Sequence, residues 1–191
     1  MRQQQAHHEL IQILRHGGVI VYPTETAYAI GCDATNTKAI RRVYAIKSRA
    51  FTKPLPIIVS SMWMANAWVR WPRGAKKMAK QFWPGPLTLV LPKKQLPGVL
   101  TAGRRNVAVR MSSHPIPPLL ARALGRPIVS TSANVSGEKA CYTLQEVRKQ
   151  LASRKMDGWL DGGRLRRRPP STIVDWMQGT PTITRQGTIR I

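Results

Sequence analysis

The stretch Glu9-Leu-Ile-Gln-Ile-Leu-Arg-His-Gly-Gly-Val-Ile-Val-Tyr-Pro23 sets the pattern from which the fold class follows. Its first half places Leu10, Ile11 and Leu14 on one face of a helix, which the glycine pair ends. The run Val-Ile-Val-Tyr that comes next is short, apolar and rich in β-branched residues, and Pro23 closes it. We therefore predict a helix followed at once by a buried strand.

The same alternation continues along most of the chain. Further helices are expected over residues 37–47, 61–68, 74–82, 116–124 and 143–151, and strands over 55–59, 87–91, 107–111, 128–131, 172–176 and 182–191. Asn36 or Thr37 can cap the first of these helices, and Thr143 with Glu146 has the form of a capping box. We predict an α/β fold with a twisted mixed sheet flanked by helices, in a single domain over residues 1–191.

The charge balance points to an anionic partner. The chain has 31 Lys and Arg against 8 Asp and Glu, a net charge of +23, but its 42% hydrophobic content favours a folded domain over disorder. Such a domain attracts RNA or nucleotides. The few carboxylates form no glycosidase-type pair and no metal cage, and His7-His8 has no Cys or His at ligand spacing, so no metal site is predicted.

The cysteines and the hydropathy pattern bear on location. Cys32 and Cys141 lie far apart without a C-x-x-C partner, and we find neither a signal peptide nor an apolar run near 18 residues. We therefore expect a cytoplasmic, reduced protein without membrane association.

Polar and cationic side chains follow directly after several predicted elements. These segments cover residues 22–26, 47–55, 107–110 and 130–134. In open α/β sheets, ligands bind at strand ends, where loops offer free N–H groups. Taken singly, each segment has a structural explanation: the threonines fit a turn, Ser132 and Asn134 fit a helix cap, and Lys47 with Arg49 fits a helix end.

Taken together, the segments resemble one family over about residues 8–190. The motifs in chain order are Gly18-Val-Ile-Val-Tyr-Pro-Thr-Glu-Thr26, Gly31-Cys-Asp33, Lys47-Ser-Arg49, Lys53-Pro-Leu55, Phe82-Trp-Pro-Gly-Pro-Leu-Thr-Leu-Val90, Val107-Ala-Val-Arg110, Ser130-Thr-Ser-Ala-Asn-Val-Ser-Gly137 and Ser171-Thr-Ile-Val-Asp175. They are similar to those of the YrdC/TsaC family, threonylcarbamoyl-AMP synthase. The resemblance is to the short form of the family, so we expect no extra C-terminal domain of the kind that longer members carry.

The resemblance implies a large basic cleft and a reaction in which L-threonine, bicarbonate and ATP give threonylcarbamoyl-AMP and pyrophosphate. It implies Mg²⁺ carried in with ATP, tRNA or double-stranded RNA as a further partner, and downstream threonylcarbamoyl-transferase proteins that modify tRNA. The implied catalytic residues are Lys47, Arg49, Ser132 and Asn134. The implied ATP contacts are Arg49, Lys53, Asn106, Ser132, Ala140 and Arg185, and the implied threonine contacts are Thr26, Arg110, Ser130 and Ser171.

Cations around an open cleft should matter for activity and little for stability, so Lys47→Ala and Arg49→Ala are expected to leave the thermal midpoint nearly unchanged. The sequence departs from the family pattern at Ala50, Lys53, Pro170 and Tyr28-Ala-Ile30.

Two other functions remain open. One is a non-catalytic protein that binds RNA or assists ribosome assembly through the basic stretches 70–80 and 164–168. The other is an enzyme of a related fold that acts on a sugar phosphate.

Overall fold

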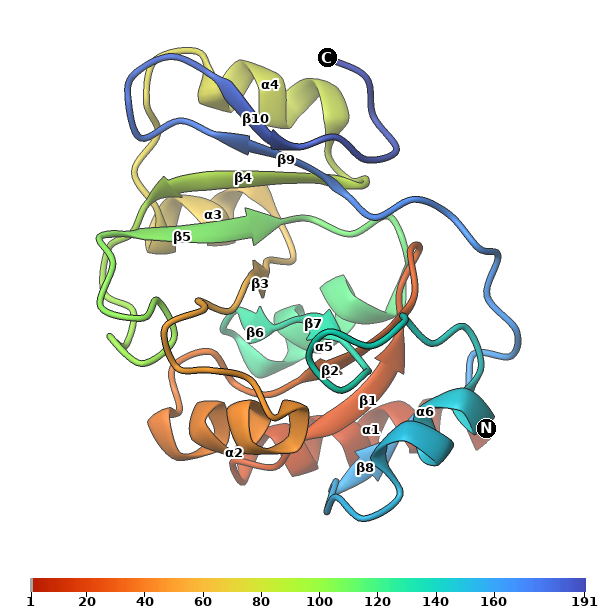
Figure 1. Cartoon of the computed structure of the whole chain (residues 1–191). Helices are drawn as coiled ribbons and strands as arrows, with labels where there is room; N and C mark the ends of the chain where they lie inside the picture. Colours follow the sequence, from red (N-terminus) through yellow and green to blue (C-terminus); the bar gives the residue numbers. More distant parts are fainter. Residues whose placement is uncertain (1) are drawn as a thin grey trace.

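The structure is a computed structural model that describes residues 2–191 (Figure 1). The helices are α1 (Arg2–Arg15), α2 (Thr37–Lys47), α3 (Met62–Trp68), α4 (Ala75–Phe82), α5 (Ile116–Leu124) and α6 (Leu144–Leu151). The strands are β1 (Ile20–Pro23), β2 (Tyr28–Gly31), β3 (Ile57–Ile58), β4 (Leu87–Pro92), β5 (Asn106–Arg110), β6 (Ile128–Val129), β7 (Thr131–Ser132), β8 (Gly158–Trp159), β9 (Thr172–Asp175) and β10 (Thr182–Arg185).

The strands form two mixed sheets. A four-stranded sheet has the order β7-β2-β1-β8, and a six-stranded sheet has the order β10-β9-β4-β5-β3-β6. Each contains parallel and antiparallel pairs: β1 runs parallel to β8 and antiparallel to β2, while β4 runs parallel to β9 and antiparallel to β5. The predicted α/β class with mixed strands flanked by helices is confirmed, and the strands divide between two sheets.

The segment 128–132 joins the two sheets. One strand was predicted over 128–131, but β6 pairs with β3 in the larger sheet and β7 pairs with β2 in the smaller one. Ser130 lies between these two strands, and its backbone N–H donates to the carbonyl of Pro56 (3.0 Å). The polar residues that follow β6 therefore lie where the two sheets meet.

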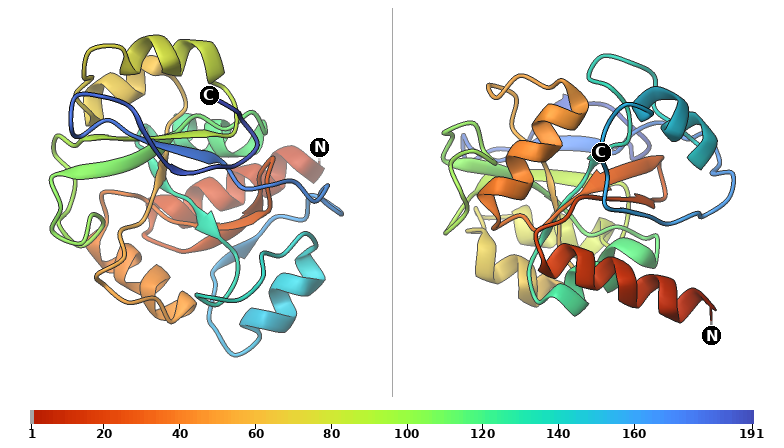
Figure 2. Two further views of the ribbon diagram at one scale, coloured as in Figure 1. Left: turned by 45° about the horizontal axis from the view of Figure 1, so that its top comes forward. Right: turned by 90° about the horizontal axis from the view of Figure 1, so that it is seen from below.

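The helices cover the sheets from two sides. Seen from below, α2 and α6 lie on one side, while α1, α3 and α5 lie on the other (Figure 2). The core between these layers is apolar, with fully buried Leu14, Ile20 and Leu87. Asn36 caps α2 by accepting from the N–H of Ala39 (3.0 Å), which confirms one of the two predicted caps.

Several predicted elements differ from the structure in extent. The first helix begins at Arg2, seven residues before the apolar pattern starts, and the last strand ends at Arg185. The strands β2 and β8 were not predicted. The predicted capping box is present, because Thr143 accepts from the N–H of Glu146, whose carboxylate accepts from the N–H of Thr143. Over residues 2–191, no helix is long and apolar enough to cross a membrane.

Candidate active site

A cavity of about 740 Å³ opens where the two sheets meet. Its walls come from β2 and β7 of the smaller sheet, from β3, β4, β5, β9 and β10 of the larger one, and from the loops around them. The predicted site residues that line it are Thr26, Arg49, Lys53, Asn106, Arg110, Ser130, Ser132, Ala140, Ser171 and Arg185. Residues from widely separated segments thus share one cavity, as ligand binding at strand ends requires.

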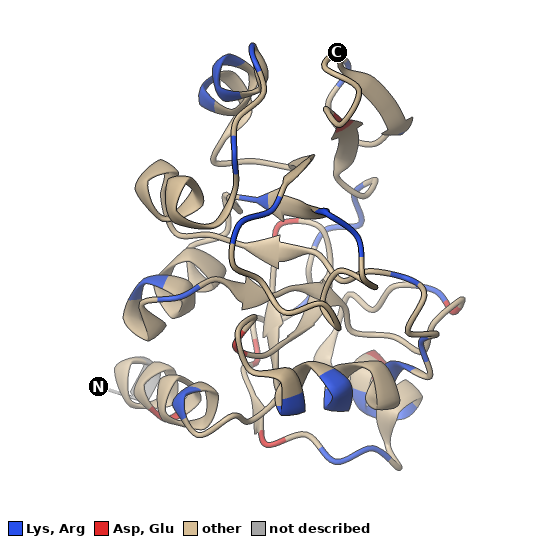
Figure 3. Cartoon of the chain, turned by 90° about the vertical axis from the view of Figure 1, so that its left-hand side faces the viewer, with Lys and Arg blue, Asp and Glu red and all other residues tan. Residues whose placement is uncertain are grey.

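The cavity is strongly cationic. Its lining includes the side chains of Arg49, Lys53, Arg104, Arg110, Arg168 and Arg185. Among the described lining residues Asp175 is the only carboxylate, and it already accepts from the N–H of Met177 (2.7 Å). Across the molecule, Lys and Arg far outnumber Asp and Glu (Figure 3). The cavity therefore favours an anionic ligand.

Lys47 and Asn134 do not line the cavity; they lie behind Ser132. Lys47 ends α2 and is only 2% exposed, and its ammonium donates to the carbonyls of Ser132 (2.5 Å) and Asn134 (2.8 Å) and to Asn134 Oδ1 (3.2 Å). Ser132 Oγ in turn donates to Asn134 Oδ1 (2.5 Å). Lys47 thus holds the Ser132–Asn134 loop in place from within the protein.

This burial changes the properties of Lys47. Desolvation, and after it the positive charge of Arg49, lowers its pKa to about 7. Lys47 was expected at the edge of an open cleft, where its removal would leave stability unchanged. The expected placement was wrong, because the side chain is buried and its ammonium supplies three hydrogen bonds to one loop. We therefore predict that removal of Lys47 lowers stability.

Arg49 anchors the next loop. Its guanidinium donates from Nε to the carbonyl of Lys53 (3.0 Å) and from Nη2 to the carbonyl of Pro54 (2.9 Å). Ser48 precedes it in the left-handed conformation (φ 47°), which turns the chain out of α2. Burial lowers the pKa of Arg49, although an arginine remains charged. The two hydrogen bonds leave part of this guanidinium free toward the cavity that it lines.

Arg110, which lines the cavity, forms an ion pair with a buried carboxylate. It lies at the end of β5, and its Nη1 is 3.4 Å from Oε1 of Glu25, whose side chain is only 7% exposed. The other carboxylate oxygen of Glu25 accepts from the hydroxyl of Ser112. Oε1 accepts no hydrogen bond, so its contact with Arg110 is an ion pair without a hydrogen bond. Glu25 therefore orients Arg110 from behind, and the sequence motif alone did not assign it this role.

Ser171 and Arg185 are brought together although they were predicted to contact different ligands. Arg185 donates from Nη2 to Ser171 Oγ (3.0 Å) and to the Ser171 carbonyl (2.8 Å), and Ser171 Oγ lies 2.8 Å from Thr88 Oγ1. Burial, and then the nearby charge of Arg110, lowers the pKa of Arg185. Two guanidinium groups near each other disfavour one another's charge, so an anion between them is stabilised.

The hydroxyl residues of the β1–β2 turn complete this wall. Thr24 Oγ1 donates to the Ala27 carbonyl (2.7 Å) and accepts from the N–H groups of Thr26 and Ala27 (both 3.2 Å). Thr24 therefore builds the turn, which agrees with the structural explanation of its motif. Thr26 Oγ1 lies 3.1 Å from Thr24 Oγ1 at the surface of the cavity.

Arg104, Tyr142 and Arg168 line the cavity and were not predicted as site residues. Arg168 belongs to the basic run 164–168, which the sequence indicated only as a charged loop. No local motif separates these three residues from other surface arginines and tyrosines, so only the folded chain reveals their position.

A cationic cavity with hydroxyl groups at the junction of two mixed sheets defines an α/β protein suited to binding an anionic small molecule. Comparison with known proteins identifies the family. The Sua5/YciO/YrdC family model, described as telomere recombination, matches residues 12–187. The chain belongs to this family.

Individual relatives agree with this assignment. The threonylcarbamoyl-AMP synthase of Thiobacillus denitrificans is 40% identical over 169 residues, which cover 87% of this chain and 88% of that protein. That of Pyrococcus abyssi is 37% identical over 176 residues, but the match covers 91% of this chain and 52% of that protein. The crystal structure of P. abyssi Sua5 complexed with L-threonine superposes with a TM-score of 0.91 at 34% identity, covering 97% of this chain and 54% of the other. The chain thus spans about half the length of the P. abyssi relative.

Proposed function

We propose that this chain joins L-threonine, bicarbonate and ATP to form threonylcarbamoyl-AMP with release of pyrophosphate, for threonylcarbamoyladenosine modification of tRNA. The observation that carries the proposal is that one cavity gathers both the threonine contacts and the ATP contacts implied by the motifs. Relatives that are 34% to 40% identical bear the name threonylcarbamoyl-AMP synthase, which supports it. The cytoplasm is the proposed compartment, consistent with two cysteines that are not bonded to each other.

The proposed threonine site is the part of the cavity around Arg110. A guanidinium binds a carboxylate through two parallel hydrogen bonds, and Arg110 is held by Glu25 so that its remaining donors are available. Thr26, Ser130 and Ser171 contribute hydroxyl side chains to the lining of the same cavity. These hydroxyls suit the amine and hydroxyl of threonine. The P. abyssi protein that was solved with L-threonine supports this assignment.

The ATP contacts implied by the motifs, which line the same cavity, are Arg49, Lys53, Asn106, Ser132, Ala140 and Arg185. Arginine and lysine neutralise phosphate oxygens, and Ser132 and Asn106 can hydrogen-bond to them. We propose that Mg²⁺ enters with ATP. Because the described residues contain no group of three or more His, Cys, Asp and Glu that could hold a metal, phosphate oxygens and water would supply most of its ligands.

The reaction requires two anions to meet. The free amine of threonine adds to the carbon of bicarbonate, water leaves, and a carbamate results. A carbamate oxygen then attacks the α-phosphorus, the bond from that phosphorus to the β-bridging oxygen breaks, and pyrophosphate leaves. No protein nucleophile takes part. The cationic lining lowers the repulsion between carbamate and triphosphate, so positioning and charge stabilisation provide the rate enhancement.

Pyrophosphate release by the purified chain tests the proposal. Release should require ATP, Mg²⁺, bicarbonate and threonine together, and should stop when any one is omitted. Serine should react more slowly, because the loss of one methyl from a pocket changes discrimination by about 1–3 kcal/mol. Release that is independent of bicarbonate, or equal turnover with many amino acids, would contradict the assignment.

A second candidate function, RNA binding, rests on two basic surfaces. One is the loop 164–168; the other is the exposed face of α4 with the turn before it, formed by Arg73, Lys76, Lys77 and Lys80. In the proposed function the threonylcarbamoyl group is finally transferred to tRNA, so RNA affinity and catalysis can coexist in one protein. The downstream transferase proteins could dock on the same protein.

RNA binding measured at increasing salt concentrations, together with pyrophosphate release, distinguishes the roles of the two basic surfaces. Replacing Arg166, Arg167 and Arg168 together should reduce the slope of log affinity against log salt by about 0.9 for each lost duplex phosphate contact. Since Arg168 lines the cavity, this variant should also lose pyrophosphate release. Replacing Lys76, Lys77 and Lys80 by Gln should reduce the RNA slope alone. An unchanged slope in both variants would contradict RNA binding through these surfaces.

A further inference from the structure

The cavity offers little aromatic surface for a nucleobase. Among the described residues that line it, only Tyr28 and Tyr142 have aromatic rings. Tyr28 is fully buried, and its hydroxyl donates to the carbonyl of Gly163 (2.8 Å) and lies 3.1 Å from Asp161 Oδ1. Tyr142 is half-buried, so its ring is the one that a ligand in the cavity can contact.

The backbone of Tyr142 is held on both sides. Its N–H donates to the Glu146 carboxylate (2.6 Å), and its carbonyl accepts from the N–H of Leu165 (2.8 Å). The carbonyl of the preceding residue, Cys141, accepts from the N–H of Tyr28 (3.0 Å). Tyr142 thus links α6, β2 and the basic loop, which fixes the position from which its ring projects.

The basic loop also contacts the ring directly. The guanidinium of Arg167 lies over the Tyr142 ring, 5.5 Å from its centre, and the next residue, Arg168, lines the cavity. A cation over an aromatic face is attracted by the ring and restricts its orientation. A ring held on one face in this way retains its second face for another planar group.

We propose that Tyr142 is the stacking platform for the adenine base of ATP, and that Arg167 acts as a positioning residue that holds the ring. This inference rests on the proposed function. Threonine and bicarbonate have no aromatic ring, and the triphosphate is matched by the cations of the cavity, so the base is the part of the substrates that needs an aromatic face. Tyr142 also follows Ala140, an implied ATP contact, by two residues, and both line the cavity.

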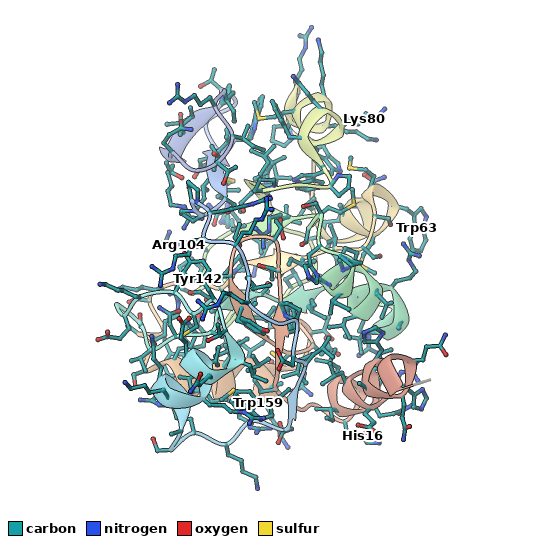
Figure 4. The ribbon with its side chains drawn as sticks, turned by 90° about the vertical axis from the view of Figure 1, so that its right-hand side faces the viewer. His16, Trp63, Lys80, Arg104, Tyr142 and Trp159 are labelled. Carbon is teal, nitrogen blue, oxygen red and sulfur yellow. The ribbon has the colours of Figure 1, made fainter. Side chains whose placement is uncertain are left out.

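The position of Tyr142 fits a small ligand in the cavity better than a macromolecule bound to the surface that carries Trp63 and Lys80. Tyr142 and Arg104 lie on one side of the molecule, whereas the exposed Trp63 and Lys80 lie on the opposite side (Figure 4). Arg104 lines the same cavity and adds a further cation to its lining. The exposed ring of Trp63 is therefore not part of this site.

Calorimetric titration with AMP and, separately, with inorganic tripolyphosphate tests the proposal. Tyr142→Ala should weaken AMP binding by about 5- to 150-fold, the effect of one lost base–aromatic stack, and leave tripolyphosphate binding unchanged. Tyr142→Phe, which keeps the ring, should bind AMP within about twofold of the unmodified protein. Arg167→Ala should weaken AMP binding by less than Tyr142→Ala does.

In kinetics, Tyr142→Ala should raise the KM for ATP and leave the KM for threonine unchanged. Equal losses for AMP and tripolyphosphate would mean that the substitution disturbs the whole site, and unchanged AMP binding would mean that the ring is structural; either result overturns the proposal. Loss of single-stranded RNA binding with unchanged AMP affinity would assign the ring to RNA and overturn it as well. If the unmodified protein binds AMP but releases no pyrophosphate with threonine and bicarbonate, the proposed function fails while the stacking site stands.

Discussion

Lys47 should make the fold more stable as the pH rises, and Lys47→Met should remove this dependence. Burial lowers the pKa of the folded Lys47 to about 7, from the value of 10.5 for a solvated lysine. Between these two values the unfolded chain retains the proton that the folded chain has lost. The unfolded state therefore binds more protons, and the free energy of unfolding increases with pH.

The size of the effect follows from the shift in pKa. One proton of difference corresponds to about 1.4 kcal/mol per pH unit. Because the folded group is half-titrated near pH 7, the gain between pH 7 and pH 9 is about 2 kcal/mol. The thiols and Tyr22 have raised pKa values and act in the opposite direction at higher pH, but they are present in both proteins. The Lys47 charge lowers the pKa of Cys141, but that pKa is about 11, so the folded thiol stays protonated between pH 7 and pH 9. The difference between protein and variant over this range therefore reports on Lys47.

Urea unfolding at pH 7, 8 and 9 measures this difference. The free energy of unfolding of the unmodified protein, minus that of Lys47→Met, should rise by about 2 kcal/mol over this range. Lys76→Met is the matched control, since Lys76 is exposed on α4, and its difference should stay constant. A constant difference for Lys47→Met would refute the reasoning. It would mean that the three acceptors around the ammonium keep Lys47 protonated despite its burial.

Three further predictions concern other residues. Arg49→Ala should lower kcat/KM by about 100-fold, a loss typical of a charge-stabilising group. It should lower the thermal midpoint less than Lys47→Ala does, because Arg49 is only half-buried and donates two hydrogen bonds to its loop rather than three. Steady-state kinetics and thermal melting measure both effects, and a drop in the midpoint without a loss of kcat/KM would assign Arg49 a purely structural role. Arg110→Lys removes the guanidinium that can form two parallel hydrogen bonds with a carboxylate. It should raise the KM for threonine by at least 10-fold and leave the KM for ATP within about twofold. An equal rise in both KM values would contradict the threonine assignment. Asn36→Ala deletes the cap of α2 and should lower the free energy of unfolding by about 1 kcal/mol in urea titrations without altering either KM; a shift in KM would mean that α2 responds to the site.

Local patterns predicted the elements whose signals lie within a few residues. The apolar stripe of α5 and the capping box of α6 are examples, because propensity and capping act over one or two turns. The strands β2 and β8 were missed for a physical reason. Each strand is short, and it is held in the sheet by pairing with β1 rather than by a local pattern. Strand β2 is close to β1 in the sequence, whereas β8 is more than 130 residues away from it.

The division at Ser130 could not be predicted from the sequence either. The run 128–132 reads as one extended segment, and only pairing with β3 on one side and β2 on the other divides it between two sheets. The motifs did identify the side chains that share the cavity. They could not show that Lys47 is buried behind Ser132, nor that Arg104, Tyr142 and Arg168 join the lining, because these facts depend on contacts between distant segments.

Formation of the mixed anhydride from labelled bicarbonate tests the central claim most directly. The purified chain is incubated with ATP, Mg²⁺, threonine and ¹³C-bicarbonate, and the products are analysed by mass spectrometry. The account predicts threonylcarbamoyl-AMP that carries one ¹³C atom, in amounts equal to the pyrophosphate released. Pyrophosphate release accompanied by unlabelled threonyl-AMP, or by AMP without any labelled adduct, would contradict it.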